Sequence, residues 1–299
     1  MRPPRLRAGD TLALVAPAGP VPADLLEKAL PVLRGWGVEV RVGPCVRAAP
    51  GAPPYLSAPD AARAAEFTEA WLDPGVRCVL AARGGYGVQR MLDLVDWAAL
   101  RAAGPKVLAG SSDVTALHRA VDVHLGLSTL FSPMPASVLF DDFAVEHLRR
   151  ALFEPERNFV VRGGSALVPG RASGVLTGGN LSLLAAGIGT PEHGSARDAI
   201  VLLEDVTESV YRLDRMLTQL VRSGWFDGVR GIVLGSWAAC GDPADVRALV
   251  ADRLGPLGVP LVEEFGFGHV ASSPTLPLGV PATLDADLGT LTFDSPALT

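Results

Sequence analysis

The chain has 299 residues, of which 48% are hydrophobic and 19% are charged, and it carries a formal net charge of -6 with a pI near 5.4. A chain of this length can bury a large core and favours two domains over one, and the composition excludes a disordered protein. The acidic balance argues against a general nucleic-acid binder, which would present a basic patch.

The cysteines and the N-terminal residues indicate in which cellular compartment the protein is expected. Cys45, Cys78 and Cys240 are far apart and form no C-x-x-C pair, so neither a disulfide framework nor a zinc site is expected. The opening MRPPRLRAGDTLALVAPAGP has a basic start, but Asp10 and the prolines break its apolar stretch before it resembles a signal peptide. No apolar run approaches the length of a membrane span. We therefore expect a cytoplasmic protein that has no membrane partner.

Short apolar runs alternate with helical patterns through the first part of the chain. The sequence predicts buried strands over residues 11–16, 38–42, 76–81 and 106–109. It predicts helices over residues 23–35, 60–72, 88–94 and 114–125. This alternation is typical of right-handed βαβ units in a mostly parallel sheet, whose sites lie in loops beyond the carboxyl ends of the strands.

The pattern weakens between about Pro133 and Gly174, where turn residues are frequent, and this change predicts a linker. The predicted organisation is a domain over residues 1–150, a linker over 151–173 and a second domain over 174–299. In the second domain we expect strands over 199–204, 231–237 and 260–264, helices around 209–222 and 243–254, and a closing hairpin in ATLDADLGTLTF. The predicted fold class is α/β, with a mostly parallel sheet domain followed by a smaller α/β domain that ends in β structure.

Two adjacent serines stand at a strand-to-helix corner in VLAGSSDVTALH. One of them could simply cap the following helix, because serine is a common N-cap. Alternatively, the corner is a nucleophile elbow, in which a serine projects from a tight turn and the next backbone N–H stabilises an oxyanion. The usual G-x-S-x-G pattern is absent, because Val114 stands two residues after Ser112. The residues themselves leave both interpretations open.

A nucleophilic serine requires a base, and the chain has five histidines. His269 lies in the Gly- and Pro-rich loop EEFGFGHVASSPTLPLG, where no core periodicity explains it. A loop histidine can equally have a structural role. The other four histidines stand on helices or in a turn, and we expect none of them to serve the serines: His118, His124, His147 and His193.

The third group of such a site would be a carboxylate, and AIVLLEDVTESVYRLDR offers two at a strand end. Asp205 and Glu208 have the spacing of a capping box, which would give them a structural role at the next helix. Glu204 is left at the carboxyl end of an apolar strand, where a site is expected. The alternative is an exposed Glu at the end of a strand.

Two glycine-rich turns complete the candidate motifs. AARGGYGVQR follows a strand and precedes a helix, so its free N–H groups could bind a phosphate or an oxyanion. It matches neither G-x-G-x-x-G nor a Walker motif, which makes a nucleotide site a weak hypothesis. In LTGGNLSLL, the pattern favours a tight turn in which Asn180 caps a helix. A non-enzymatic nucleotide-binding module remains an alternative, although it gives no role to Glu204 and His269.

In combination these segments resemble a known family. GDTLALVAPAGP, AARGGYGVQRML, GSSDVTALH, LTGGNLSLL, VLLEDVTESVYRLDRMLTQL and FGFGH followed by PLGVPATLD occur in this order over nearly the whole chain. The sequence resembles the LD-carboxypeptidase family of serine peptidases, which includes muramoyltetrapeptide carboxypeptidases and peptidases that confer self-immunity to microcin C. The resemblance implies a Rossmann-like amino-terminal domain, a smaller carboxyl-terminal domain, an active site divided between them, and a homodimer.

The resemblance also implies a Ser-Glu-His triad. It selects Ser112, the serine directly before the Asp, as the nucleophile, and leaves Ser111 a turn-forming role. It aligns Glu204 with the family's acid and His269 with its base.

Further roles follow from the same resemblance. The backbone N–H groups of Gly85 and Asp113 would form the oxyanion hole. A carboxypeptidase must also hold a free terminal carboxylate, for which Arg83 is a candidate, although a structural ion pair would explain Arg83 equally well. No metal and no cofactor are required.

The implied activity is that of a serine carboxypeptidase that releases terminal D-Ala from cytoplasmic muropeptide tetrapeptides through an acyl-enzyme, in peptidoglycan recycling. Its partner would be a small peptide, with no role for nucleic acid. The alternative activity is a microcin-type amidase that acts on aminoacyl nucleotides. Such an enzyme would need an aromatic residue for base stacking, and Trp237 in LGSWAACGD is either that residue or a packed aromatic at a strand end.

Overall fold

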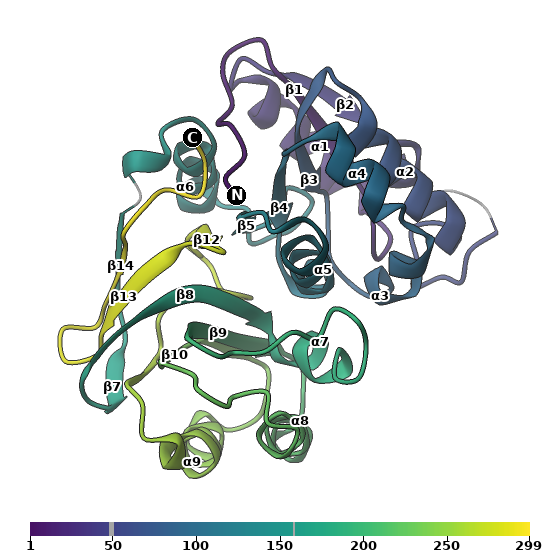
Figure 1. Ribbon diagram of the computed structural model, residues 1–299. Helices are drawn as coiled ribbons and strands as arrows, with labels where there is room; N and C mark the ends of the chain where they lie inside the picture. Colours follow the sequence, from purple (N-terminus) through teal and green to yellow (C-terminus); the bar gives the residue numbers. More distant parts are fainter. Residues whose placement is uncertain (48–50, 158) are drawn as a thin grey trace.

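The computed structural model describes residues 1–47, 51–157 and 159–299, and Figure 1 shows two α/β units built on separate sheets. The first unit has a sheet in the order β12-β5-β4-β3-β1-β2. Its strands are β1 (Thr11–Val15), β2 (Glu39–Val42), β3 (Val76–Ala81), β4 (Val107–Gly110), β5 (Thr129–Phe131) and β12 (Leu276–Leu278). Neighbouring strands are parallel except for β12, which pairs antiparallel with β5.

The apolar strands of the first unit are buried on both faces, as the uninterrupted hydrophobic runs predict. Along β1, Leu12 and Leu14 belong to one core cluster, whereas Ala13 and Val15 belong to another. Successive side chains of a strand point to opposite faces, so both faces of this sheet carry a core. The helices that cover the faces are α1 (Ala23–Arg34), α2 (Asp60–Leu72), α3 (Val88–Met91), α4 (Trp97–Ala103), α5 (Thr115–Leu125) and α6 (Asp142–Phe153).

The second unit is built on a sheet in the order β6-β14-β13-β8-β9-β10-β11-β7. Its strands are β6 (Val160–Arg162), β7 (Ser165–Val168), β8 (Arg171–Asn180), β9 (Ala199–Val206), β10 (Gly231–Ala238), β11 (Leu261–Glu263), β13 (Pro281–Asp285) and β14 (Thr290–Phe293). The strands from β8 to β11 are parallel, and the outer pairings are antiparallel.

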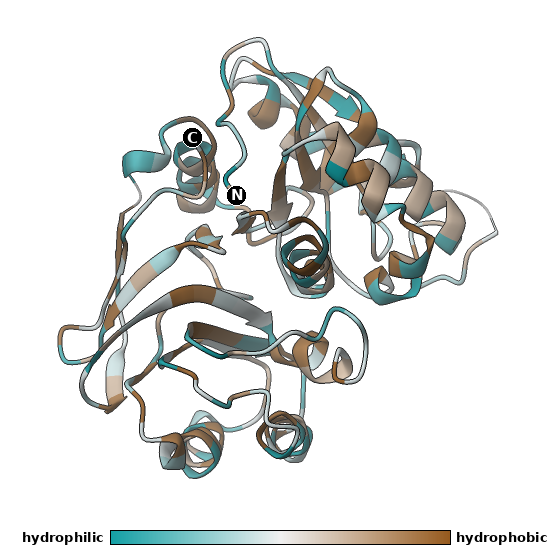
Figure 2. Cartoon of the chain, viewed as in Figure 1, coloured by the Kyte–Doolittle hydropathy of each residue, from teal (hydrophilic) through white to brown (hydrophobic). Residues whose placement is uncertain are grey.

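Helices cover one face of the second sheet, and the other face joins the core of the first unit. The helices are α7 (Leu181–Ala186), α8 (Val210–Arg222) and α9 (Pro243–Leu254); their buried side chains belong to one core cluster, and Figure 1 shows α8 and α9 below the sheet. In Figure 2, α8 and α9 carry both hydrophilic and hydrophobic colours, as helices do that bury one face. On the opposite face, Leu202 and Phe267 belong to the same core cluster as Leu14 and Phe131 of the first unit. No helix within the described residues has the length and apolarity needed to cross a membrane.

The segment expected to be a linker differs from that expectation. Residues 151–173 contain β6, β7 and the start of β8, which pair with β14, β11 and β13 of the second sheet. These are short strands with exposed residues at the edges of a sheet, so their sequence lacks the apolar pattern of buried strands. In addition, β12 returns to the first sheet, and the amide of Arg5 donates to the carbonyl of Thr299 at 2.8 Å. The two units are therefore joined at several points of the chain.

The carboxyl ends of the central strands of the two sheets face each other. α5, which follows β4, contacts β8 and α7 of the second unit. At the same boundary, the side-chain amide of Gln89 donates to the carbonyl of Leu183 at 3.4 Å. This arrangement places the loops after β3 and β4 opposite the ends of β8 and β9, where Glu204 stands.

Candidate active site

Ser112 occupies the apex of the turn that connects β4 to α5. The backbone of Ser111 is extended, with φ −149° and ψ −169°, whereas Ser112 has φ +59° in the left-handed region. A left-handed conformation costs an L-residue about 1–2 kcal/mol, and such strain is typical of functional turns. Ser111 is buried and Ser112 is partly exposed. The turn therefore exposes part of Ser112, and not Ser111, at the surface.

The glycine turn after β3 lies directly against Ser112. A Cβ atom on Gly84 would stand 2.8 Å from Ser112 Cβ and 3.0 Å from Ser112 Oγ, so only glycine permits this approach. The amide of Gly19 donates to the Gly84 carbonyl at 3.0 Å and holds the turn in place. Gly85 follows with φ +118° and is exposed. The structure thus brings together the elbow and the turn that the sequence placed far apart.

Asp113 links the elbow to the glycine turn through its side chain, a contact that the sequence did not indicate. Its Oδ2 accepts the Val88 N–H at 2.7 Å, at the first residue of α3. Burial raises the pKa of Asp113 to about 6, against the smaller lowering effects of the Val88 N–H and of the Arg63 charge. Arg83, the candidate for a substrate carboxylate, is exposed and donates from Nη1 to the Pro20 carbonyl at 2.6 Å.

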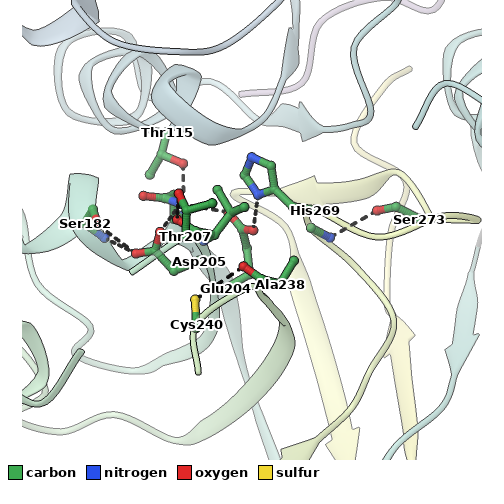
Figure 3. Close-up of polar contacts among 12 residues, drawn as sticks. Thr115, Ser182, Glu204, Asp205, Thr207, Ala238, Cys240, His269 and Ser273 are labelled. Carbon is green, nitrogen blue, oxygen red and sulfur yellow. Dashed lines mark hydrogen bonds and ion pairs between the residues drawn. The ribbon is translucent and has the colours of Figure 1, made fainter. Parts of the chain in front are cut away.

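Glu204 and His269 form a hydrogen-bonded pair in the second unit, and Figure 3 shows the imidazole above the carboxylate. His269 Nδ1 donates to Glu204 Oε2 at 2.6 Å. Glu204 is 0% exposed, so the alternative of an exposed strand-end Glu is wrong. Burial lowers the pKa of His269, but the hydrogen bond and charge of Glu204, with the charge of Asp205, outweigh it and hold this pKa above its usual value.

The pair leaves His269 Nε2 as the ring nitrogen that could accept a proton from a nucleophile. No hydrogen bond joins Ser112 Oγ to His269 within the described part of the chain. Such contacts are often long without substrate and tighten when it binds.

Asn180 orients Glu204 in addition to capping a helix. Its Oδ1 accepts the Leu183 N–H at 3.3 Å, which confirms the predicted cap. Its Nδ2 donates to Glu204 Oε1 and to Asp205 Oδ1, both at 3.1 Å. A side-chain amide can accept and donate simultaneously, so one residue serves both functions. The sequence GGN before a helix indicated the cap but gave no sign of the carboxylates across the sheet.

Asp205 does not form a capping box with Glu208, so that expectation is wrong. Asp205 is the seventh residue of β9, and its Oδ2 accepts from the backbone amide and the hydroxyl of Ser182 at 2.9 and 2.7 Å, at the start of α7. Glu208 instead forms an ion pair with Arg212 at 3.5 Å. Because β9 continues past Glu204 to Val206, Asp205 lies beside β8 and not at the start of α8.

A glycine again permits the close contact around the carboxylate. A Cβ atom on Gly268, which has φ +100°, would lie 2.6 Å from Glu204 Oε2. The Gly268 amide donates to Ser273 Oγ at 3.1 Å, which fixes the loop that carries His269 (Figure 3). The G-F-G-H pattern in the loop was the available signal for this contact.

The other four histidines have structural partners. His118 is buried, donates from Nε2 to the Gly110 carbonyl at 2.9 Å, and has a pKa lowered by burial to about 4. His147 on α6 is half-buried and accepts the Thr275 N–H at 3.1 Å. His124 donates to Glu192 at 2.9 Å, and His193 donates to the Thr190 carbonyl at 2.7 Å.

A pocket of about 480 Å³ lies between α9 and the loop that leads to His269. Its lining includes Trp237, Arg247, Glu263 and Val270. Trp237 packs partly against the core of the second unit, so it is a packed strand-end aromatic that also borders a pocket. Within the described residues, no cluster of three or more His, Cys, Asp or Glu side chains is arranged to hold a metal ion.

The sequence and the fold both match known proteins. The model of the LD-carboxypeptidase N-terminal domain matches residues 12–132, and that of the LD-carboxypeptidase C-terminal domain matches residues 173–284. A relative from Streptomyces coelicolor is 56% identical over 302 residues, covering 100% of this chain and 97% of its own length. The murein tetrapeptide carboxypeptidase of Pseudomonas aeruginosa is 32% identical over 293 residues, covering 92% of this chain and 93% of its own.

Solved structures give the same result. The muramoyltetrapeptide carboxypeptidase from Oxalobacter formigenes is 31% identical with a TM-score of 0.82, covering 96% of this chain and 99% of that one. The microcin C7 self immunity protein MccF, solved in complex with aspartyl sulfamoyl adenosine, is 20% identical with a TM-score of 0.85 over 100% of both chains, and it shares the fold. Together, the matched domains and the full-length relatives show that this chain belongs to the LD-carboxypeptidase family.

Proposed function

We propose that this protein is a serine LD-carboxypeptidase that uses Ser112, Glu204 and His269 as its triad. The observation that carries the proposal is the 2.6 Å hydrogen bond between His269 and the buried Glu204 in one unit, together with the strained serine elbow at Ser112 in the other. A buried carboxylate that holds one imidazole nitrogen prepares the other nitrogen to accept a proton. Family membership supports a peptidase that acts on peptides, and the geometry supports the serine type.

In the proposed mechanism, His269 Nε2 takes the proton from the Ser112 hydroxyl while Oγ bonds to the scissile carbonyl carbon. The imidazolium, stabilised by Glu204, then gives that proton to the leaving amine as the C–N bond breaks. Water, deprotonated by His269, attacks the acyl-enzyme and restores Ser112. The N–H groups of Gly85 and Asp113 are the proposed oxyanion donors, each of which typically contributes about 2.7–4 kcal/mol.

The proposed substrate is a muropeptide tetrapeptide, from which the enzyme releases terminal D-Ala in peptidoglycan recycling. The printed names of the relatives from Pseudomonas aeruginosa and Oxalobacter formigenes support this substrate class. Arg83 stands beside the glycine turn, and its Nη1 donates to the Pro20 carbonyl; among the described residues its other N–H groups have no hydrogen-bond partner and could hold the terminal carboxylate. A cytoplasmic location and a homodimer remain predictions from the sequence and the resemblance.

Release of D-Ala should depend on both the stereochemistry and the free carboxylate of the substrate. We expect hydrolysis of the tetrapeptide to exceed that of the all-L diastereomer and of the C-terminally amidated analogue by at least about tenfold in kcat/KM. Loss of one charge-assisted hydrogen bond costs about 1.5–3 kcal/mol, or roughly ten- to a hundredfold. Chromatographic detection of released D-Ala would measure this, and equal rates on all three peptides would contradict the LD specificity.

The alternative activity is hydrolysis of aminoacyl nucleotides, and the position of Trp237 on the pocket of about 480 Å³ is the observation that favours it. Aspartyl sulfamoyl adenosine, assayed beside the tetrapeptide, separates the two activities. We expect the tetrapeptide to have the higher kcat/KM. A preference for the nucleotide conjugate that falls in a Trp237→Ala variant would replace the proposed substrate with the alternative.

Neither unit should be active alone, because the proposed triad draws on both. A chain cut near Ser165 separates Ser112 from Glu204 and His269, and it also removes β12 from the edge of the first sheet. We expect no D-Ala release from either half expressed separately. Activity in the isolated amino-terminal half would show that Glu204 and His269 are not part of the triad.

A further inference from the structure

Thr115 connects the helix of the elbow to the strand that leads to the site's carboxylate. It is the first residue of α5, three residues after Ser112, and it is 0% exposed. Its Oγ1 accepts the backbone N–H of Asn180 at 3.0 Å, across the boundary between the two units, and Figure 3 shows this contact. A buried amide requires a partner, so this contact constrains both units.

The approach at this point is too close for any residue but glycine at position 179. A Cβ atom on Gly179, which has φ +138°, would lie 2.6 Å from Thr115 Oγ1 and 2.9 Å from its Cγ2. The hydroxyl and the methyl group of Thr115 therefore both press on the end of β8. This contact fixes the position as well as the hydrogen-bonding direction of Asn180.

From Asn180 the contacts continue to the proposed base. Asn180 Nδ2 donates to Glu204 Oε1 at 3.1 Å, and Glu204 Oε2 accepts from His269 Nδ1 at 2.6 Å. Asn180 also donates to Asp205, which is itself held by Ser182. Each group in this series is buried or mostly buried, so a displacement at Thr115 passes to Glu204 instead of being absorbed by solvent.

We infer that Thr115 is a positioning residue that holds the Glu204–His269 pair of the second unit in reach of Ser112 in the first. The inference rests on the proposed triad. A triad divided between two units needs a fixed distance between them, because a misplacement of about 1 Å can cost roughly 100-fold in rate. Thr115 supplies that constraint one helical turn from the nucleophile.

Three variants test the role of the hydroxyl. Thr115→Val keeps the shape of the side chain but leaves the Asn180 amide without an acceptor. Thr115→Ser retains the acceptor and should restore the activity. Thr115→Ala opens space for a water molecule, and it serves as the second loss-of-acceptor variant if the valine variant does not fold.

Thr177→Val is the matched control. Thr177 Oγ1 accepts from Arg119 Nη1 at 2.9 Å, so it joins the same helix and the same strand as the Thr115–Asn180 contact. It lies outside the series that leads to Glu204. If these hydrogen bonds merely dock the two units, Thr115→Val and Thr177→Val should therefore lose activity to a similar extent.

The measurements are kcat and KM for the tetrapeptide, the rate of covalent labelling by a fluorophosphonate, and the denaturant midpoint of unfolding. For Thr115→Val or Thr115→Ala we expect kcat and the labelling rate to fall about ten- to a hundredfold, with KM changed less than about threefold. Thr115→Ser and Thr177→Val should stay within about threefold of the unaltered protein in both rates.

The outcomes are distinguishable from those that test the proposed function. Equal labelling rates for the unaltered protein and Thr115→Val would overturn the inference while leaving the triad in place, as would equal losses in Thr115→Val and Thr177→Val. If the unaltered protein is labelled at Ser112 but does not hydrolyse the tetrapeptide, the substrate proposal fails and the labelling still decides the role of Thr115. If Ser112 is not labelled at all, the triad itself fails, and the inference fails with it.

Discussion

Replacement of Ser112 by alanine is expected to lower kcat for D-Ala release by about 10⁴- to 10⁶-fold, as loss of the nucleophile does in other serine peptidases. The reason is that Ser112 is the residue at the apex of the elbow, with φ +59° and its Oγ against the glycine turn. The protein should remain folded, because the substitution removes one partly exposed oxygen and leaves the backbone unchanged. Single-turnover and steady-state assays on the tetrapeptide would measure the loss.

Ser111→Ala is the matched control for that substitution. Ser111 has an extended backbone and is 8% exposed, and its side chain makes no capping hydrogen bond. We expect the variant to keep its activity within about threefold and its free energy of unfolding within about 1 kcal/mol. A reversal, with Ser111→Ala inactive and Ser112→Ala active, would show that the nucleophile is misassigned.

The backbone strain at Ser112 gives an independent check that does not depend on the substrate. Glycine adopts positive φ without the cost of about 1–2 kcal/mol that an L-residue incurs. Ser112→Gly should therefore be inactive but at least as stable as the unaltered protein in urea unfolding. A clear loss of stability would mean that the hydroxyl has a structural role at this turn.

Replacement of Glu204 by glutamine is expected to lower kcat/KM by about 10³- to 10⁴-fold, because an amide neither stabilises the imidazolium nor fixes the tautomer with Nδ1 protonated. Glu204 is fully buried, and its Oε2 is 2.6 Å from His269 Nδ1. Asn180 Nδ2 donates to Glu204 Oε1 on the other side of the carboxylate. A glutamine has one accepting oxygen, so in the variant either Asn180 or His269 would face an NH2 group that cannot accept its hydrogen bond.

The substitution should also move the pH dependence in a defined direction. Burial lowers the pKa of His269, and the hydrogen bond and charge of Glu204 raise it to a net value above 6.5. In Glu204→Gln the lowering effect of burial remains while the raising effects of Glu204 are lost, so the pKa of His269 should fall. The residual activity, which requires the neutral imidazole, should therefore persist to lower pH than that of the unaltered enzyme.

The stability of the folded chain is linked to the same proton. Because the pKa of His269 is higher in the folded than in the unfolded chain, protonation of His269 stabilises the folded state. This contribution is fully present below the pKa of the unfolded chain, near 6.5, and it is lost as the pH rises through the pKa of the folded chain. In Glu204→Gln this dependence should disappear or reverse. NMR titration of the imidazole and urea unfolding between about pH 4.5 and pH 8.5 would follow both effects, since this range spans about two units on either side of an ordinary histidine pKa.

Glu263→Gln provides the control for a strand-end carboxylate. Glu263 ends β11 in the same sheet, is also buried, and pairs with Arg247 at 2.6 Å instead of with a histidine. Its replacement should leave the acidic limb of the pH profile unchanged. An equal shift in both variants would mean that the pH effect reports the charge of the whole sheet edge and not the Glu204–His269 contact.

The sequence by itself determined the central strands, the helices between them and the candidate triad. Uninterrupted apolar runs are buried on both faces of a parallel sheet, so β1, β3 and β4 could be located from pattern alone. The motifs and their order identified the family and nominated Ser112, Glu204 and His269. These properties are local, since they depend on neighbours in the chain.

Tertiary structure alone decided the edges of the sheets and the contacts around the site. Short edge strands such as β6 and β7 bury little apolar surface, so their formation depends on a partner strand from elsewhere in the chain. Three contacts around the site each involve residues of different elements: the hydrogen bond from Asn180 to Glu204, the hydrogen bond from Ser182 to Asp205, and the close approach of Gly84 to Ser112. A capping box or a glycine turn can be recognised from spacing because its partners are a few residues apart. A hydrogen bond such as that from Asn180 to Thr115 exists only once two sheets have packed, and no pattern within one segment encodes that distance.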